Sequence, residues 1–158
     1  MEYKLVAKPQ FTLVGYARKF NSQTSYKEIP EFWNGLYFNK GARIAEGDEI
    51  CGEYGVCYDV DDMGGFTYMI ADHYDPGTVI PNGAEVIVVP AHTWAIFECH
   101  GSLPDSLQQV NTYIFNEWLP NSKQYRMSGD LNIEAYFDAI PNNPEDDYSE
   151  IWIPVEEI

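Results

Sequence analysis

Apolar and polar side chains alternate along three segments in the first half of the chain, a pattern typical of half-buried β-strands. Between the first two strand patterns the apolar spacing lengthens to that of a helix, which is predicted near residues 26–40. The sequence DDMGG separates the last two strand patterns and predicts a hairpin connection. The strand patterns are residues 11–20, 53–60 and 64–74, and the apolar residues at helical spacing are Ile29, Phe32, Trp33, Leu36 and Tyr37.

The same order of patterns returns in the second half. A strand-like segment interrupted by Pro90 is followed by a helix predicted near residues 103–118. Ser102 and Asp105 form a capping-box-like pair at the start of this helix, and Pro120 marks its end. The apolar stripe of the helix is Leu107, Val110, Ile114, Phe115 and Trp118, and the strand patterns are residues 85–101, 131–137 and 150–155.

The two helical stripes lie at a constant separation along the chain. Phe32 precedes Ile114 by 82 positions, and Trp33 precedes Phe115 by the same number. Two β-α-β-β units within 158 residues predict one α+β domain, residues 1–158, built from repeats of about residues 1–80 and 81–158. The expected fold is a pseudo-twofold antiparallel sheet with helices on one face, and the seam between the repeats is a natural concave site.

The charge of the chain excludes one large class of partner. Twenty-five acidic residues against nine Lys and Arg give a formal net charge of −16. Such a surface repels a phosphate backbone, so no direct binding to nucleic acid is expected. No apolar run approaches the roughly 20 residues that span a bilayer, and the first residues lack an apolar signal-peptide core. The expected protein is cytoplasmic, with no membrane association.

Motifs for cofactors and metals are missing from the sequence. Cys51, Cys57 and Cys99 have no zinc-like spacing and are interpreted as structural thiols. No Gly-rich phosphate loop, nucleophile elbow or zinc-protease motif occurs, so neither a cofactor nor a metal is expected. A site for a small molecule would therefore be formed by individual charged and aromatic residues.

One such residue is Glu134, in the strand pattern LNIEAYF. Side chains alternate along a strand, so Tyr136 lies on the same face as Glu134. Isolated strand carboxylates usually face water. A carboxylate that faces a pocket must instead be protonated or be matched by a cation.

Several segments together resemble one known family. TWAIFECHGSLPDSLQQVNTYIFNEWLPNSKQY, IEAYF and EIWIPV look like the second half of the GyrI-like, or AraC-type effector-binding, domain family, and YGVCYDV with FTYMIA resembles the hairpin of its first half. The resemblance covers nearly the whole chain. It implies a duplicated β-α-β-β fold, and the chain is similar to the stand-alone, integron-cassette-like members, which have no helix-turn-helix domain.

The resemblance also implies a binding site for lipophilic cations. In the family, a glutamate on the penultimate strand points into a groove between the repeats, and Glu134 matches that position. Trp152 matches an aromatic residue on the final strand, and aromatic rings around a carboxylate suit a hydrophobic cation. The predicted ligand-binding residues are Glu134, Tyr136, Trp152, Trp94, Tyr16 and Tyr58.

Three functions follow from these expectations. The first is a protein that sequesters or senses lipophilic cations, as a transcription-regulation or xenobiotic-sequestration module. The second is a hydrolase of strained, cyclopropane-type natural products, in which Glu134 would act on water with the assistance of Tyr136. The third is a protein-interaction role with a regulator or with gyrase, as in the gyrase-inhibitor branch. The first needs the fewest assumptions, and binding is expected rather than catalysis.

Overall fold

The computed structural model describes residues 2–43, 52–137 and 147–158, with the side chains of residues 36–43 left out. The predicted α+β class is confirmed, because antiparallel strands are packed against helices. The chain divides into two compact units. We call residues 11–89 the first-repeat unit, and residues 1–10 with 90–158 the second-repeat unit. Among the described residues, no helix has the length and apolar character needed to cross a membrane.

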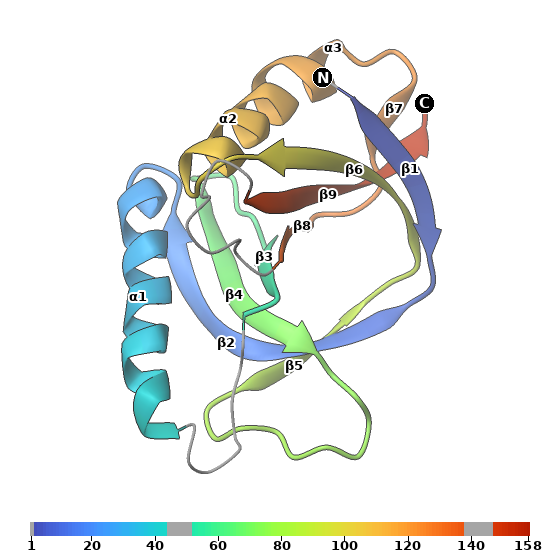
Figure 1. Ribbon diagram of the computed structural model, residues 1–158. Coiled ribbons are helices and arrows are strands. Elements are labelled where there is room, and N and C mark those ends of the chain that lie inside the picture. Colours follow the sequence, from blue (N-terminus) through green and yellow to red (C-terminus); the bar gives the residue numbers. More distant parts are fainter. Residues whose placement is uncertain (1, 44–51, 138–146) are drawn as a thin grey trace. The chain divides into compact units, whose positions relative to one another are not determined.

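The first-repeat unit is a four-stranded antiparallel sheet with one long helix. Its strand order is β3-β4-β2-β5. Figure 1 shows α1 running along β2, in the blue part of the chain. The elements are β2 (Phe11–Asn21), α1 (Ser25–Arg43), β3 (Tyr54–Tyr58), β4 (Gly65–His73) and β5 (Glu85–Val89).

The helix α1 covers one face of this sheet through the residues that the sequence predicts. Ile29, Phe32 and Trp33 pack against a buried cluster of β2 and β4 residues, and the side chains of Leu36 and Tyr37 lie outside the described part. The Trp33 indole donates a hydrogen bond of 3.0 Å to the Tyr68 hydroxyl. The buried cluster consists of Val14, Phe20, Tyr68 and Ile70.

The second-repeat unit also consists of an antiparallel sheet with a helix on one face, and it has an additional short strand, β7. Its sheet has the order β1-β6-β9-β8, and β7 pairs with the end of β9. The helix α2 packs on β6 and β9 (Figure 1). The elements are β1 (Tyr3–Lys8), β6 (His92–His100), α2 (Asp105–Tyr113), the π-helical turn η2 (Ile114–Trp118), α3 (Leu119–Asn121), β7 (Tyr125–Met127), β8 (Asn132–Tyr136) and β9 (Tyr148–Glu157).

The strands β1 and β7 escaped the sequence analysis. Each unit contains a β-α-β-β repeat and one additional edge strand. The additional strand of the first-repeat unit is β5, and that of the second-repeat unit is β1. β1 continues along the chain into β2 but pairs with β6, and β5 continues into β6 but pairs with β2. This reciprocal exchange explains why the first unit ends at residue 89, and not near the predicted boundary at residue 80.

The second predicted helix differs from expectation at both ends. Its N-cap is Pro104, without a side-chain hydrogen bond, so Ser102 and Asp105 do not form the predicted capping box. Helical structure continues through the π turn to Asn121, past the predicted end at Pro120. A π turn carries one more residue per turn, which rotates the residues after it relative to the predicted stripe. Phe115, within the turn, is 37% exposed, whereas Leu107, Val110 and Ile114 are buried as predicted.

Candidate functional site

The sheet of the second-repeat unit has two faces of different chemistry. One face packs against α2 through Ala95, Phe97, Cys99, Ile151, Ile153 and Val155. Because side chains alternate and paired residues of adjacent strands point the same way, the intervening residues share the other face. We call this the indole face; its members are Lys4, Val6, Lys8, His92, Trp94, Ile96, Glu98, His100, Ile133, Ala135, Tyr148, Glu150, Trp152 and Pro154.

A buried carboxylate, Glu150, lies on the indole face. Its exposed fraction is 7%, which is rare for glutamate. The Tyr148 hydroxyl donates to its Oε2 at 2.5 Å, and the Trp152 indole N–H donates to its Oε1 at 3.0 Å. Among the described residues, no Lys, Arg or His nitrogen comes within ion-pair distance of this carboxylate. Glu150 is therefore held by neutral donors.

Two indole rings lie on the face that carries this carboxylate, and one of them, Trp152, is bonded to it. Trp94 is fully buried and Trp152 nearly so, and their ring centroids lie 6.1 Å apart at an interplanar angle of 60°. Buried aliphatic residues, Ile96 and Ile133 among them, complete this part of the face. The cross-strand neighbours of Glu150 are Ala135 and Glu98, and the burial of Glu150 strengthens any electrostatic interaction made there.

A chain of hydrogen-bonding groups leads from Glu150 to the surface. The Tyr148 hydroxyl also lies 3.3 Å from Glu98, whose side chain is 53% exposed and lies 3.3 Å from His100. Burial, followed by the hydrogen bond to Glu150, raises the pKa of Tyr148. The hydrogen bonds from His100 and Tyr148 lower the pKa of Glu98. Tyr148 thus remains a neutral hydroxyl donor between two carboxylates.

The structure does not bring Glu134 and Trp152 together. Ile133 pairs with Trp152, so Ile133 and not Glu134 shares the indole face. Glu134 and Tyr136 lie on the α2 face, where Tyr136 packs against the helix-side core. The Tyr136 hydroxyl donates to Glu134 Oε1 at 2.6 Å, as their shared face suggested.

The other predicted residues divide between faces as well. Trp94 and Trp152 share the indole face, as described above. Tyr16 lies on the α1 face of the first-repeat sheet. Tyr58 lies on the opposite face of that sheet, where burial and the charge of Glu85 raise its pKa to about 12.

The sequence analysis missed Glu150, although a signal was present. Tyr148, Glu150 and Trp152 occur at every second position of the final strand, so they must share one face. An acidic residue between two aromatic residues on one strand face is unusual for a solvent-facing row. EIWIPV, one of the segments that resemble the family, contains this glutamate.

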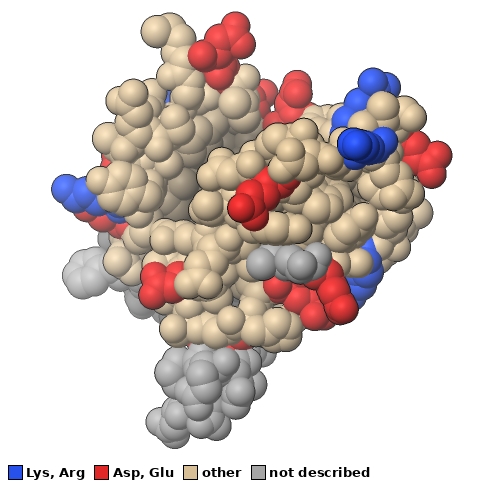
Figure 2. Space-filling view, turned by 90° about the horizontal axis from the view of Figure 1, so that it is seen from above, with Lys and Arg blue, Asp and Glu red and all other residues tan. Residues whose placement is uncertain are grey.

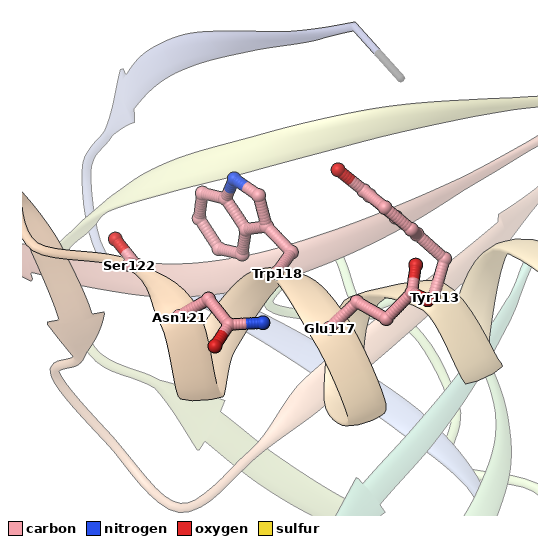
Figure 3. A pocket seen from close by; sticks show the side chains of 5 residues that line it. All are labelled: Tyr113, Glu117, Trp118, Asn121 and Ser122. Carbon is pink, nitrogen blue, oxygen red and sulfur yellow. The ribbon is translucent and has the colours of Figure 1, made fainter.

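A hollow lies along the helical segment from α2 to α3. It has a volume of about 390 Å³ and is lined by Tyr113, Glu117, Trp118, Asn121 and Ser122. Figure 3 shows the Tyr113 and Trp118 rings rising from the helix, with the Glu117 carboxylate beside them. Glu117 is exposed, and a charge pair in contact with water contributes little binding energy. The hollow is therefore a weaker candidate than the surroundings of Glu150.

The described residues give no support to two other kinds of site. Within residues 2–43, 52–137 and 147–158, no group of three His, Cys, Asp or Glu side chains could hold a metal ion. On the surface seen in Figure 2, the acidic side chains form separate patches with uncharged side chains between them. An extended acidic ridge, as expected of a protein that imitates DNA, is not seen on that surface.

Comparison with known proteins connects this geometry to a family. The family model described as integron-associated effector binding protein matches residues 4–155. No curated protein matches the chain. The structure resembles SAV2435 bound to tetraphenylphosphonium, with a TM-score of 0.77 and 26% identity over 99% of this chain and 94% of that one.

Two further solved structures share the fold at lower identity. The integron cassette protein VCH_CASS2 of Vibrio cholerae has a TM-score of 0.69 and 17% identity, over 98% of this chain and 95% of that one. EcmrR in a DNA complex has a TM-score of 0.64 and 19% identity, over 99% of this chain and 58% of that one. The fold therefore occurs both in a cassette protein and as part of a longer protein that binds DNA.

Proposed function

Because the chain belongs to the integron-associated effector-binding protein family, which confirms the resemblance seen in its sequence, we propose that it binds lipophilic organic cations. The proposed site is the indole face, with Glu150 as the counter-charge and Trp94 and Trp152 as stacking surfaces. The cation found with SAV2435 supports the choice of ligand class.

The observation that carries this proposal is the burial of Glu150 among neutral donors. Removing a carboxylate from water costs several kcal/mol, and hydrogen bonds from a hydroxyl and an indole recover only part of that cost. A cation with its charge spread over aromatic groups is weakly hydrated, so it loses little on entering an apolar site. It would neutralise Glu150 and gain contact with the indole rings, a contact worth about 0.5–2 kcal/mol.

Glu134, the residue proposed from the sequence, supplies a matched comparison. Glu134 and Glu150 lie on adjacent strands, and each accepts a hydrogen bond from a tyrosine two positions away. They lie on opposite faces of one sheet. A Gln substitution at either position removes one negative charge and keeps the shape of the side chain.

The test is calorimetric titration of the wild type, Glu150→Gln and Glu134→Gln with tetraphenylphosphonium and with neutral triphenylphosphine oxide. We expect the wild type to bind the cation in the micromolar range or tighter, about −8 kcal/mol. Glu150→Gln should weaken cation binding by about tenfold or more, because a buried opposite charge is lost. Its effect on the neutral compound should be much smaller, and Glu134→Gln should resemble the wild type.

Two results would contradict this assignment. A loss confined to Glu134→Gln would make Glu134 the counter-charge and would move the site to the α2 face. Equal losses for charged and neutral compounds would show that neither carboxylate acts through its charge.

Hydrolysis is the second candidate function, favoured by the tyrosine hydroxyl on each carboxylate. In such a reaction the carboxylate takes a proton from water, and the hydroxide attacks a carbon of a strained cyclopropane. The C–C bond breaks, the leaving carbon takes the tyrosine proton, and the carboxyl proton returns to the tyrosine. Mass spectrometry should then detect a product heavier by one water. An unchanged substrate after long incubation with stoichiometric protein would rule this activity out.

A further inference from the structure

A lysine of the chain already lies on one of the proposed ligand-stacking rings. Lys8 is the last residue of β1 and belongs to the indole face. Its ammonium nitrogen lies 4.6 Å from the centroid of the Trp152 ring, within the range of a cation–π contact. The same indole donates its N–H to Glu150. Trp152 therefore contacts an ammonium group through its ring face and a carboxylate through its edge.

The contact requires a particular conformation of a flexible side chain. On β1, Lys4 lies in the row of Ile96 and Trp152, whereas Lys8 is paired with His92 farther along the sheet. Lys8 is half-buried, so its ammonium group is partly withdrawn from water. Only nine Lys and Arg occur in the 158 residues, and one of them lies on the indole beside the buried carboxylate.

We propose that Lys8 is a specificity-determining residue that acts as a tethered competitor for organic cations. This inference rests on the proposed function. One ring face accepts one cation, so a ligand that stacks on this face of Trp152 must displace the Lys8 ammonium group. The displaced ammonium group remains attached nearby, where it repels a cation but not a neutral compound. Lys8 thereby favours ligands whose aromatic surface compensates for its displacement.

Titration of Lys8→Ala with tetraphenylphosphonium tests whether Lys8 lowers the affinity for the cation. We expect its affinity to rise by about threefold to tenfold, from the usual size of a cation–π contact. Triphenylphosphine oxide should gain less, because it feels no repulsion from Lys8. Lys123→Ala is the matched control: Lys123 is exposed in the same unit, and its removal changes the net charge equally.

An NMR measurement on the wild type tests the contact itself and does not depend on how a variant folds. The ring current of Trp152 should shift the Lys8 ε-methylene protons upfield of those of Lys123 in the empty protein. Addition of tetraphenylphosphonium should return them toward the Lys123 position. Trp152→Leu should remove the upfield shift without ligand.

The outcomes separate this inference from the function on which it rests. If Glu150→Gln weakens cation binding but Lys8→Ala behaves like Lys123→Ala, the competitor role is wrong and the binding function stands. Lys8 protons that are not shifted in the empty protein, or that stay shifted at saturation, would also overturn it. If tetraphenylphosphonium does not bind, the proposed function fails and the competitor role fails with it. If it binds equally to the wild type and to Glu150→Gln, the indole face is not the site, and the competitor role fails while cation binding stands.

Discussion

Two tyrosine–glutamate pairs lie back to back in the second-repeat sheet. Tyr136 donates to Glu134 at 2.6 Å, and Tyr148 donates to Glu150 at 2.5 Å. Both pairs are separated by two positions on a strand, so each pair shares a face. The first pair borders the α2 core and is half-buried, whereas Glu150 is buried beside the indole rings.

The difference lies in what surrounds each carboxylate. Glu150 has an indole donor in addition to the tyrosine, and its chain of contacts leads through Tyr148 to the exposed Glu98. Glu134 lies opposite Ile151, on the side of the sheet that the unit's own helix covers. The same local motif therefore borders the helix-side core on one face and places a buried carboxylate beside an indole on the other.

The largest expected difference between the pairs is in stability. Trp152→Phe keeps an aromatic ring but removes a donor from buried Glu150, so unfolding free energy should fall by about 1–3 kcal/mol. Tyr136→Phe removes a donor from half-buried Glu134, where water can replace it, and should cost about 0.5 kcal/mol. Urea denaturation of each variant measures both values.

The lost volume of the indole also contributes to the Trp152→Phe result, so the donor effect needs its own measurement. In a double-mutant cycle, Trp152→Phe should couple to Glu150→Gln by about 1 kcal/mol or more, because the two residues share a hydrogen bond. The same tryptophan change should be additive with Glu134→Gln. Coupling of similar size in both cycles would break the distinction between the faces.

The architecture can be predicted from the sequence because its helices and its duplication both appear as periodic patterns of apolar residues. The stripes from Phe32 and from Ile114 specify two helices, and the repeat at 82 positions specifies the duplication. β1 was missed because its identity as a strand comes from pairing with the distant β6, and no local pattern shows this exchange. The extension of the helix past Pro120 depends likewise on the π turn, which apolar spacing does not reveal.

The site is predictable only in part. Alternation correctly placed Tyr136 beside Glu134, and the aromatic residues Trp94 and Trp152 do share a face. Alternation cannot say which face of a strand meets the helix, since both faces of β9 carry buried apolar residues. The register between β8 and β9 decides it, and that register follows from tertiary packing.

A smaller effect concerns the α2 face at high pH. Burial raises the pKa of Cys99 to about 12, with smaller contributions from the charges of Glu134 and then Glu150. The folded chain retains the thiol proton after the unfolded chain has released it. The stability contribution of the protonated thiol is therefore complete below pH 9 and is lost as the pH rises toward 12.

Comparison of the wild type with Cys99→Ala isolates this contribution. Between pH 9 and 10, the stability of the wild type relative to the variant should fall by about 1 kcal/mol. Glu134→Gln should lower the pKa of Cys99 more than Glu150→Gln does, because Glu134 makes the larger contribution. A pH-independent difference between wild type and Cys99→Ala would mean that the α2 face is open to water.

The smallest expected effect is at the exposed end of the Tyr148 pair. The hydrogen bond from His100, followed by that from Tyr148, lowers the pKa of Glu98. Its charged form therefore supports the fold above the unfolded pKa, and that support is lost as pH falls through the lower folded value. Glu98 is solvent-exposed, so its NMR-detected carboxyl titration is a better readout than stability. His100→Gln should raise its pKa most, Tyr148→Phe less, and Tyr136→Phe not at all. If Tyr136→Phe moved the Glu98 titration as far as Tyr148→Phe, the two tyrosines would not be insulated by the sheet, and the assignment of the pairs to opposite faces would fail.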